Sequence, residues 1–362
     1  MANYTLMIRT LSPLHIGTGR ELRNMFDFVT GDNQTGRMNV DKLLNEKFDP
    51  KNPNALPGEL LGKDINNPAY FRYILTGRPR SIKADSVLRE CVKDVYDVPY
   101  IPGSSIKGAM RTAFGAALLA RSRLSNGMID LRGNPKRADD RLEKELFGAD
   151  PQNDLFRALQ ISDAQLPKEL RDPNNTMQVL NTNPITVKSA NSSVPVEAEC
   201  INAMLDFSAD LKIDDYVLKE KNMPNKDLLS KNLMSVIKKH GDQRLHHLQD
   251  WYKNVAGAER INSFLSQLLN FSEGSLSKVN NMALMQMGFG TGWDGMTYSD
   301  WLKTDDVFFE DLYQGHLRRK QNKGRAPMRE PGTPFPTSRK VTMLSEKPNL
   351  PLGWVLLTLE PK

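Results

Sequence analysis

Residues 99–111 of the chain read Pro99-Tyr100-Ile101-Pro102-Gly103-Ser104-Ser105-Ile106-Lys107-Gly108-Ala109-Met110-Arg111. Proline and glycine at positions 102 and 103 indicate a turn, and the two serines that follow are suited to cap a helix start. Beyond the turn, apolar side chains recur at helical spacing and predict one buried face: Ile106, Ala109, Met110, Ala113, Phe114 and Ala117. We therefore expect a turn that opens directly into a helix from Ser104 to about Arg121.

The start of this helix is a candidate phosphate-binding site. Lys107 and Arg111 are four residues apart, so their side chains lie next to each other on the helix. The first turn of a helix presents free N–H groups, and its dipole favours anions. Ser104, Ser105, Lys107 and Arg111 are therefore candidate phosphate contacts. An ordinary amphipathic helix with a good cap explains the same residues equally well.

Size and composition favour a soluble protein of two domains. The chain has 362 residues, of which 39% are hydrophobic and 25% charged, enough for a sizeable core. No apolar stretch is long enough to span a bilayer, and the N-terminus lacks the pattern of a signal peptide. Cys91 and Cys200 are the only cysteines, which excludes a disulfide framework and a cysteine-rich zinc site. We expect a cytoplasmic protein without a membrane partner.

Positive charge is concentrated in residues 317–340. The net charge is +6, from 49 basic and 43 acidic residues. This window has one acid, Glu330, and eight basic residues: Arg318, Arg319, Lys320, Lys323, Arg325, Arg329, Arg339 and Lys340. Its prolines and glycines predict a loop, and a basic loop of this kind is suited to a polyanion. A solvated charged loop is the alternative.

Strand and helix patterns alternate without a regular βαβ order, which favours an α+β fold with antiparallel sheets. Strand-like ranges are 3–11, 158–163, 179–188, 194–201, 203–213, 282–287 and 353–359. Helical spacing recurs at 142–147 and through 227–271. Residues 30–85 are rich in glycine, asparagine, proline and charge, and we interpret them as a long irregular insertion.

A glycine-rich segment at 288–295 is a second candidate phosphate site. Gly290 to Gly295 fits GxGxxG, with Glu310 at the spacing of a ribose-binding acid, but no clean helix opens at Gly295, so a dinucleotide fold is disfavoured. Glycines let backbone N–H groups approach a phosphate closely, and Trp293 could stack on a base or pack in the core. The candidate contacts here are Gly288, Gly290, Gly292 and Trp293.

The sequence offers weak candidates for catalysis. The segment Gly103 to Gly108 has the ingredients of a Walker A loop in the wrong order, so an NTPase is disfavoured. His15 ends a strand beside Gly17 and Gly19, where it could act as an acid or base on a ribose 2′-OH or simply hold phosphate or backbone. An acidic group could hold Mg²⁺, although an amphipathic surface helix explains it better: Asp305, Asp306, Glu310 and Asp311. We expect no metal and no cofactor.

Four segments in order resemble the RAMP superfamily of CRISPR-associated RNA-binding proteins, and within it the family of the fifth Csm subunit of type III-A effector complexes. They are 11–19, 100–111, 288–293 and the C-terminal pair 334–340 and 351–355. The resemblance implies two ferredoxin-like (RRM-like) domains with helical and loop insertions. We place the N-terminal domain at 1–165, with an insertion at about 30–98. The C-terminal domain is 166–362, with a helical insertion at about 215–275.

The resemblance also implies a function. It implies a non-catalytic subunit that binds the 3′ portion of CRISPR RNA (crRNA), caps the backbone filament and assists maturation of the crRNA 3′ end. The implied partners are crRNA, target RNA by proximity, other Csm-type backbone subunits and trimming nucleases recruited in trans. Implied RNA contacts are His15, Gly17, Gly19, Ser104, Ser105, Lys107, Arg111, Gly288, Gly290, Gly292 and Trp293, to which charge adds Arg318, Arg319, Lys320, Arg339 and Lys340.

Two other functions stay open on the sequence alone. One is a metal-independent ribonuclease that processes crRNA with His15 as acid–base. The other is a scaffold that contacts mainly protein. The residue Asp294, an acid directly after Trp293, does not suit a loop that meets phosphate, which argues against direct phosphate contact at 293–295.

Overall fold

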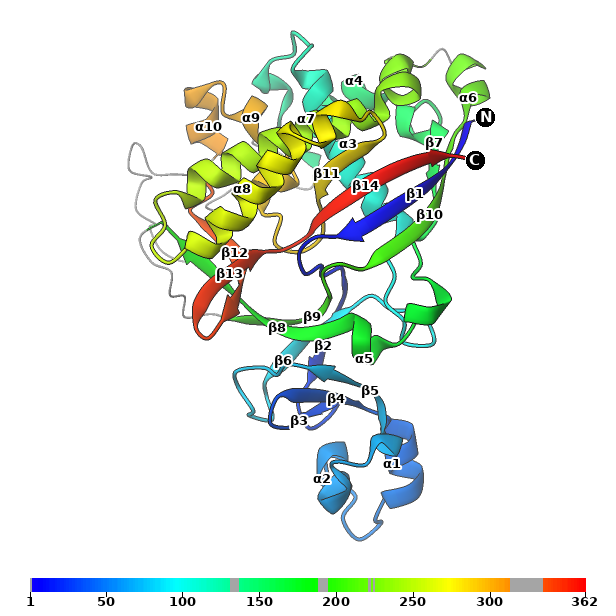
Figure 1. Cartoon of the computed structure of the whole chain (residues 1–362), viewed down its shortest axis with the longest axis vertical. Helices are drawn as coiled ribbons and strands as arrows, with labels where there is room; N and C mark the ends of the chain where they lie inside the picture. The colour runs from blue at the N-terminus through cyan, green and yellow to red at the C-terminus, as the bar shows by residue number, and fades with distance from the viewer. Residues whose placement is uncertain (1, 131–136, 188–194, 221–222, 224, 313–334) are drawn as a thin grey trace.

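The structure is a computed structural model that describes residues 2–130, 137–187, 195–220, 223, 225–312 and 335–362 (Figure 1). It is a mixed α+β fold, as the sequence predicts. Figure 1 shows a helical layer at one end, a curved sheet below it, and a small lobe with two helices at the opposite end.

One antiparallel sheet of five strands forms the centre of the molecule. Its strands, in the order β11-β14-β1-β10-β7, are Met282–Gln286 (β11), Trp354–Pro361 (β14), Ala2–Thr10 (β1), Asp206–Ile213 (β10) and Leu159–Ile161 (β7). Side chains alternate along β1, and Leu6 and Ile8 are fully buried. The register places Leu6 between Ala209 of β10 and Leu359 of β14.

Two helices complete a ferredoxin-like arrangement around this sheet. They are α3 (Gly103–Leu119), between β1 and β7 in the chain, and α7 (Lys226–Tyr252), after β10. The chain order β1-α3-β7-β10-α7-β14 with the sheet order β14-β1-β10-β7 is the βαββαβ pattern. Ile106, Met110 and Phe114 of α3 are fully buried in the main core, as the helical spacing predicts.

A second, larger sheet follows the path β2-β6-β9-β8-β5-β4-β3, with a β12-β13 hairpin paired to β8. Its strands are Gly17–Arg23 (β2), Phe28–Thr30 (β3), Gln34–Met38 (β4), Phe71–Thr76 (β5), Val87–Cys91 (β6), Met177–Thr186 (β8), Val196–Ile201 (β9), Ser338–Leu344 (β12) and Lys347–Pro351 (β13). The loop that carries His15 joins β1 of the central sheet to β2 of this sheet, and the glycine-rich loop at 288–295 follows β11 of the central sheet.

The remaining helices lie around the two sheets. They are Val40–Lys47 (α1), Pro57–Leu61 (α2), Asp140–Phe147 (α4), Pro173–Thr176 (α5), Asp215–Glu220 (α6), Glu259–Glu273 (α8), Ser299–Leu302 (α9) and Asp306–Leu312 (α10). Helices α1 and α2 form the small lobe in Figure 1 around their own buried cluster of Val29, Met38, Leu43 and Leu61. Among the helices of the described ranges, none combines the length and apolar character needed to cross a bilayer.

The structure corrects one expectation about these elements. Residues 30–85 are not irregular, because they contain β4, β5, α1 and α2. Strand β4 buries polar residues, so it lacks an apolar pattern: the Thr35 hydroxyl donates to the Gly77 carbonyl at 2.8 Å, and Arg37 to the Asp27 carbonyl at 2.6 Å. The central sheet takes strands from both sides of residue 165, and the predicted domain boundary there stays a prediction.

Candidate nucleic-acid interface

The start of α3 is capped by a distant carboxylate and not by its own serines. The Gly103 N–H donates to Asp163 Oδ1 at 2.8 Å, while the N-cap position is Pro102 and carries no side-chain cap. A Cβ at position 103 would collide with the Ile161 carbonyl oxygen, so only glycine allows this close approach. The predicted cap by Ser104 or Ser105 is therefore wrong, because Asp163 supplies the acceptor and so adds a negative charge at the helix start.

The two cations of this helix have partners within the protein. Lys107 Nζ donates to the Leu159 carbonyl at 2.8 Å, and burial lowers the pKa of this lysine. Arg111 forms ion pairs with Glu143 at 2.8 Å and Asp154 at 2.9 Å. Its guanidinium carbon also lies 3.7 Å from the centre of the Phe147 ring. Their predicted contact with phosphate stays a prediction, which this geometry does not favour.

His15 lies inside the protein. It is 2% exposed, and its Nδ1 is 2.6 Å from the Glu199 carbonyl oxygen. Its other ring nitrogen, Nε2, would lie 2.9 Å from a Cβ at Gly17. Burial lowers the pKa of His15, so the ring is neutral at neutral pH. A general acid or base must reach its substrate, so the ribonuclease alternative is not favoured.

The loop that carries His15 packs on Glu199, a residue with a buried carboxylate. Glu199 is 1% exposed and accepts hydrogen bonds from the Tyr73 hydroxyl at 2.7 Å and the Cys91 N–H at 3.0 Å. It also forms an ion pair with Lys93 Nζ. These contacts join β5, β6 and β9, because one residue of each strand takes part. The loop that carries His15 therefore rests on a fully bonded polar centre.

The glycine-rich loop packs directly on the His15 loop. The Phe289 N–H donates to the His15 carbonyl at 2.8 Å. Gly288 has a positive φ of 76°, and a Cβ there would lie 2.6 Å from the same carbonyl oxygen. Two of the segments that the sequence singles out, 11–19 and 288–293, thus meet, and Gly17 and Gly19 lie exposed beside them.

Two cations surround the aromatic residue of this loop. Lys340 Nζ lies 4.4 Å from the centre of the Phe289 ring, the Arg89 guanidinium carbon lies 5.0 Å from it, and the His15 ring meets it edge-on. We call Arg89, Phe289 and Lys340 the Phe289 site. Burial, and then the charge of Arg89, lowers the pKa of Lys340. Across the part of the chain that the structure describes, neither cation has an ion-pair partner.

Sequence reasoning identified Lys340 but missed Arg89 and Phe289. Phe289 stands between Gly288 and Gly290, and an aromatic residue inside a glycine loop is a signal that could have been used. Arg89 lies in β6, about 200 residues away in the chain from Phe289. Its position beside the ring follows only from the pairing of strands.

The end of the glycine loop faces inward. Asp294 is 4% exposed, and its carboxylate contacts Arg244 Nη1 at 3.0 Å and Arg339 Nη1 at 3.0 Å. Arg339 is itself 7% exposed, so its predicted RNA contact gains no support from this geometry. The same pairing explains the acid after Trp293: Asp294 holds two arginines and does not face a phosphate.

The other predicted positions divide into three groups. Trp293 is half-buried against the rings of Phe309 and Phe335. Of the two roles that the sequence left open for Trp293, this contact favours packing within the protein over stacking on a base. Of the predicted magnesium ligands, Asp305, Asp306 and Glu310 have described side chains, and no group of three metal-ligating side chains is found among the described residues. Arg318, Arg319 and Lys320 lie outside the described residues.

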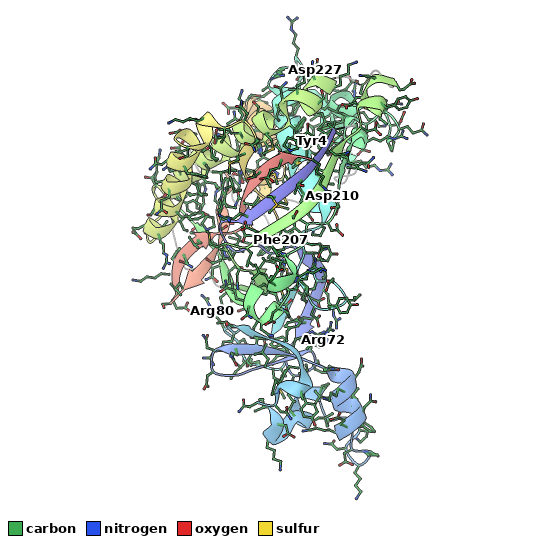
Figure 2. All side chains as sticks on the ribbon, turned by 45° about the vertical axis from the view of Figure 1, so that its right-hand side comes forward. Tyr4, Arg72, Arg80, Phe207, Asp210 and Asp227 are labelled. Carbon is green, nitrogen blue, oxygen red and sulfur yellow. The ribbon has the colours of Figure 1, made fainter. Side chains whose placement is uncertain are left out.

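The open face of the central sheet differs from an RRM platform. RRM domains stack bases on aromatic side chains of this face. Here the outward positions are polar or aliphatic on both central strands: Asn3, Thr5, Met7 and Arg9 of β1, and Asp206, Ser208, Asp210 and Lys212 of β10. Figure 2 labels Asp210 on this sheet. The outward positions of β1 and β10 therefore offer no aromatic ring on which a base could stack, and Asp206 and Asp210 on this face are paired with Arg9 and Lys362.

The α+β fold and its glycine loops now define a class of protein. The chain matches the RAMP superfamily over residues 7–293, and it belongs to that superfamily. Among curated proteins it is similar to two that are described as "CRISPR system Cms protein Csm5". That of Streptococcus thermophilus is 28% identical over 185 residues, which cover 45% of this chain and 51% of the relative, about half of its length. That of Methanocaldococcus jannaschii is 23% identical over 96% of this chain and 87% of the relative.

The fold of the chain is also similar to that of two solved structures. A chain of a cryo-EM structure of a Csm-crRNA-target RNA ternary complex in a type III-A CRISPR-Cas system has a TM-score of 0.67 and 22% identity, and the match covers 99% of this chain and 100% of that one. The crystal structure of T. onnurineus Csm5 has a TM-score of 0.61 and 20% identity, over 96% of this chain and 99% of that one. At these identities the likeness shows a shared fold.

Proposed function

We propose that this chain is the Csm5-type, non-catalytic RNA-binding subunit of a type III-A CRISPR effector complex. It binds the 3′ portion of crRNA and caps the row of backbone subunits. Membership of the RAMP superfamily and the two Csm5 relatives support this function. The similar fold of a chain within a Csm-crRNA-target RNA complex is consistent with it.

The observation that carries the proposal is the Phe289 site. Two cations without acidic partners in the described structure lie on one aromatic ring, next to exposed glycines of the His15 loop. Phe289 holds both cations near its ring by cation–π attraction, which leaves their N–H groups to bind phosphate. RNA is a chain of phosphates, and its affinity for protein comes largely from such contacts. The site therefore suits the backbone of a single RNA strand.

The partners follow from this position in a complex. Backbone subunits of the Csm type and the crRNA are the direct partners, and target RNA comes close through its pairing with the crRNA. The basic stretch 317–340 follows the RNA or a neighbouring subunit, as its charge suggests. By leaving the RNA beyond the cap accessible, the subunit assists trimming nucleases recruited in trans to mature the 3′ end.

The salt dependence of RNA binding tests the site. We expect Arg89→Ala and Lys340→Ala each to weaken binding of a single-stranded RNA of guide length. Each should reduce the slope of log affinity against log salt by about 0.7, because one phosphate contact is lost. Lys231→Ala is the matched control, since it removes the same charge from an exposed lysine of α7. Fluorescence anisotropy across a salt series measures all four proteins.

An unchanged slope in both variants would refute the Phe289 site as the RNA contact. The position along the guide needs a second measurement in the reconstituted complex. Photoreactive nucleotides placed near the 3′ or the 5′ end of crRNA should crosslink to residues 288–292 only from the 3′ side. Crosslinks from the 5′ side alone would contradict the capping function, and cleavage of the RNA by the purified chain would contradict a non-catalytic role.

A further inference from the structure

The turn at residues 94–97, between β6 and α3, presents two neighbouring apolar side chains to solvent. Val95 is 87% exposed and Tyr96 is 80% exposed, more than any other large hydrophobic side chain of the described residues. Single exposed apolar side chains are common on proteins, whereas exposed apolar groups that lie together are typical of a surface that contacts another molecule. We call residues 94–97 the Tyr96 turn.

Hydrogen bonds hold the Tyr96 turn in one shape. The Asp94 carboxylate accepts from the Tyr96 N–H at 2.8 Å and from the Val98 N–H at 3.0 Å. The Asp94 N–H donates to the Val98 carbonyl at 2.9 Å, and the Asp97 N–H donates to the Asp94 carbonyl at 3.1 Å. Aspartate is common in turns because its side chain bonds the backbone N–H groups that follow it. The exposure of Val95 and Tyr96 is therefore set by the backbone of the turn.

A second carboxylate fastens the turn to β5. Asp97 is buried and has a φ of 65°, and its carboxylate accepts from Arg72 Nε at 2.9 Å. Arg72, which Figure 2 labels, belongs to β5. Because the backbone around Val95 and Tyr96 is already fixed, a partner that covers them loses little affinity to the ordering of a loop. Exposed side chains on a fixed turn are suited to anchor an interface.

The charges beside the turn favour a protein partner over RNA. Aromatic residues that stack on the bases of a single strand work together with cations that bind its backbone. Here Arg72 is already paired with Asp97, and Lys93 is paired with the buried Glu199. Asp94 has no cationic partner within the part of the chain that the structure describes, so its charge repels a phosphate. The same charge attracts a basic protein surface.

We propose that the Tyr96 turn docks into an apolar pocket with a basic rim on the adjacent backbone subunit of the effector complex. Tyr96 is the anchor, because tyrosine is enriched among the residues that dominate the binding energy of protein interfaces. Val95 adds apolar surface beside it, and the charge of Asp94 meets the basic rim. The inference rests on the proposed function, in which this chain caps the row of backbone subunits, and it adds which part of the chain makes that contact.

A titration with the full chain tests this proposal on a row of backbone subunits that is assembled on crRNA without the capping subunit. We expect the double variant Val95→Ser with Tyr96→Ser to bind the row about tenfold or more weakly, because the anchor is lost. Its affinity for free crRNA should equal that of the wild type. The matched control is Tyr216→Ser with Val307→Ser, which removes the same two side chains from other exposed positions and should bind the row normally.

The charge of the turn is tested separately. Asp94→Asn keeps a side-chain oxygen that can accept from both N–H groups, so the turn keeps its shape while the charge is lost. We expect this variant to bind the row about threefold more weakly at low salt, and the difference to vanish at high salt, because salt screens the contact with the basic rim. A difference that does not change with salt would contradict the basic rim.

The outcomes separate this inference from the proposed function. Wild-type affinity of the double variant for the row would overturn the inference and leave the proposed function intact, whereas a wild type that binds neither the row nor free crRNA would overturn both. An equal loss of affinity for the row and for free crRNA would show that the turn contacts RNA, against the proposal. So would a wild-type dimer in gel filtration that the double variant dissociates, since the occupant would then be a second copy of this chain.

Discussion

Asp294 is a single carboxylate between the buried guanidinium groups of Arg244 and Arg339, and this position lowers its pKa. Burial alone would raise the pKa, but Arg244 and Arg339 outweigh burial and lower it to about 2. Breaking a buried pair by removing one partner is strongly destabilising, because the other charge is left behind. This residue therefore fixes the end of the glycine loop to α7 and β12.

We expect Asp294→Asn to lower the free energy of unfolding at neutral pH by about 3 to 5 kcal/mol. The folded-state pKa lies below the usual value, so the stabilisation is complete above about pH 4 and is lost as the pH falls toward about 2. The difference between wild type and variant should narrow across that window. Urea unfolding at several pH values measures it, and a constant difference would contradict the assignment.

At the same scale, the sequence could identify candidate cations but not their partners. Lys340 and Arg339 are neighbours in a basic stretch and look alike in the sequence. Strand β12 sends Arg339 inward to Asp294 and leaves Lys340 beside Phe289. Alternation along a strand decides which neighbour binds solvent or ligand, and the sequence does not reveal which face is covered.

Among the elements, those with regular apolar spacing were predictable and those without it were not. Helix α3 begins within one residue of the predicted start, because its buried positions follow a helical period. Strand β4 was not predicted, because it buries threonine, glycine and arginine in place of an alternating apolar pattern. The acceptor at the start of α3 was not predicted either, because Asp163 is 60 residues away in the chain and lies beside Gly103 only in the folded protein.

A pair of substitutions tests the cap of α3. We expect Asp163→Ala to lower the free energy of unfolding by about 0.5 to 2 kcal/mol, since the Gly103 N–H loses its acceptor. Ser104→Ala should have almost no effect, because Ser104 is exposed and caps nothing. Chemical denaturation of both variants measures the two losses. The reverse ranking would restore the serine cap that the sequence suggests.

At the scale of the whole molecule, the central sheet joins distant parts of the chain. Strand β1 lies between β10 and β14, and β7 pairs with β10. A division at residue 165 separates β1 and β7 from their neighbours, and each half would expose unpaired strand edges and a large apolar surface. The family resemblance made the ferredoxin-like pattern predictable. It did not predict that strands from both sides of residue 165 pair in one sheet, because pairing over such distances leaves no local signal in the sequence.

Expressing residues 1–165 and 166–362 separately tests the predicted boundary. We expect neither half to unfold cooperatively alone, and we expect co-expression to restore a soluble complex, because β1 then returns to its place. Circular dichroism during heating and gel filtration measure both properties. A half that unfolds cooperatively alone would show that the boundary at 165/166 separates independent domains.

The place of β1 also governs when the protein can fold during its synthesis. Strand β1 is made first among the strands, its partner β10 follows nearly 200 residues later, and β14 comes after residue 353. At about 5 to 20 residues per second, the ribosome needs roughly 20 to 70 seconds to travel from β1 to β14. Until β10 is made, Leu6 and Ile8 have no partner strand, and from then until β14 is made β1 is paired along one edge only. The nascent chain therefore carries an unpaired apolar strand until β10 is made, and its central sheet is complete only when β14 has been translated.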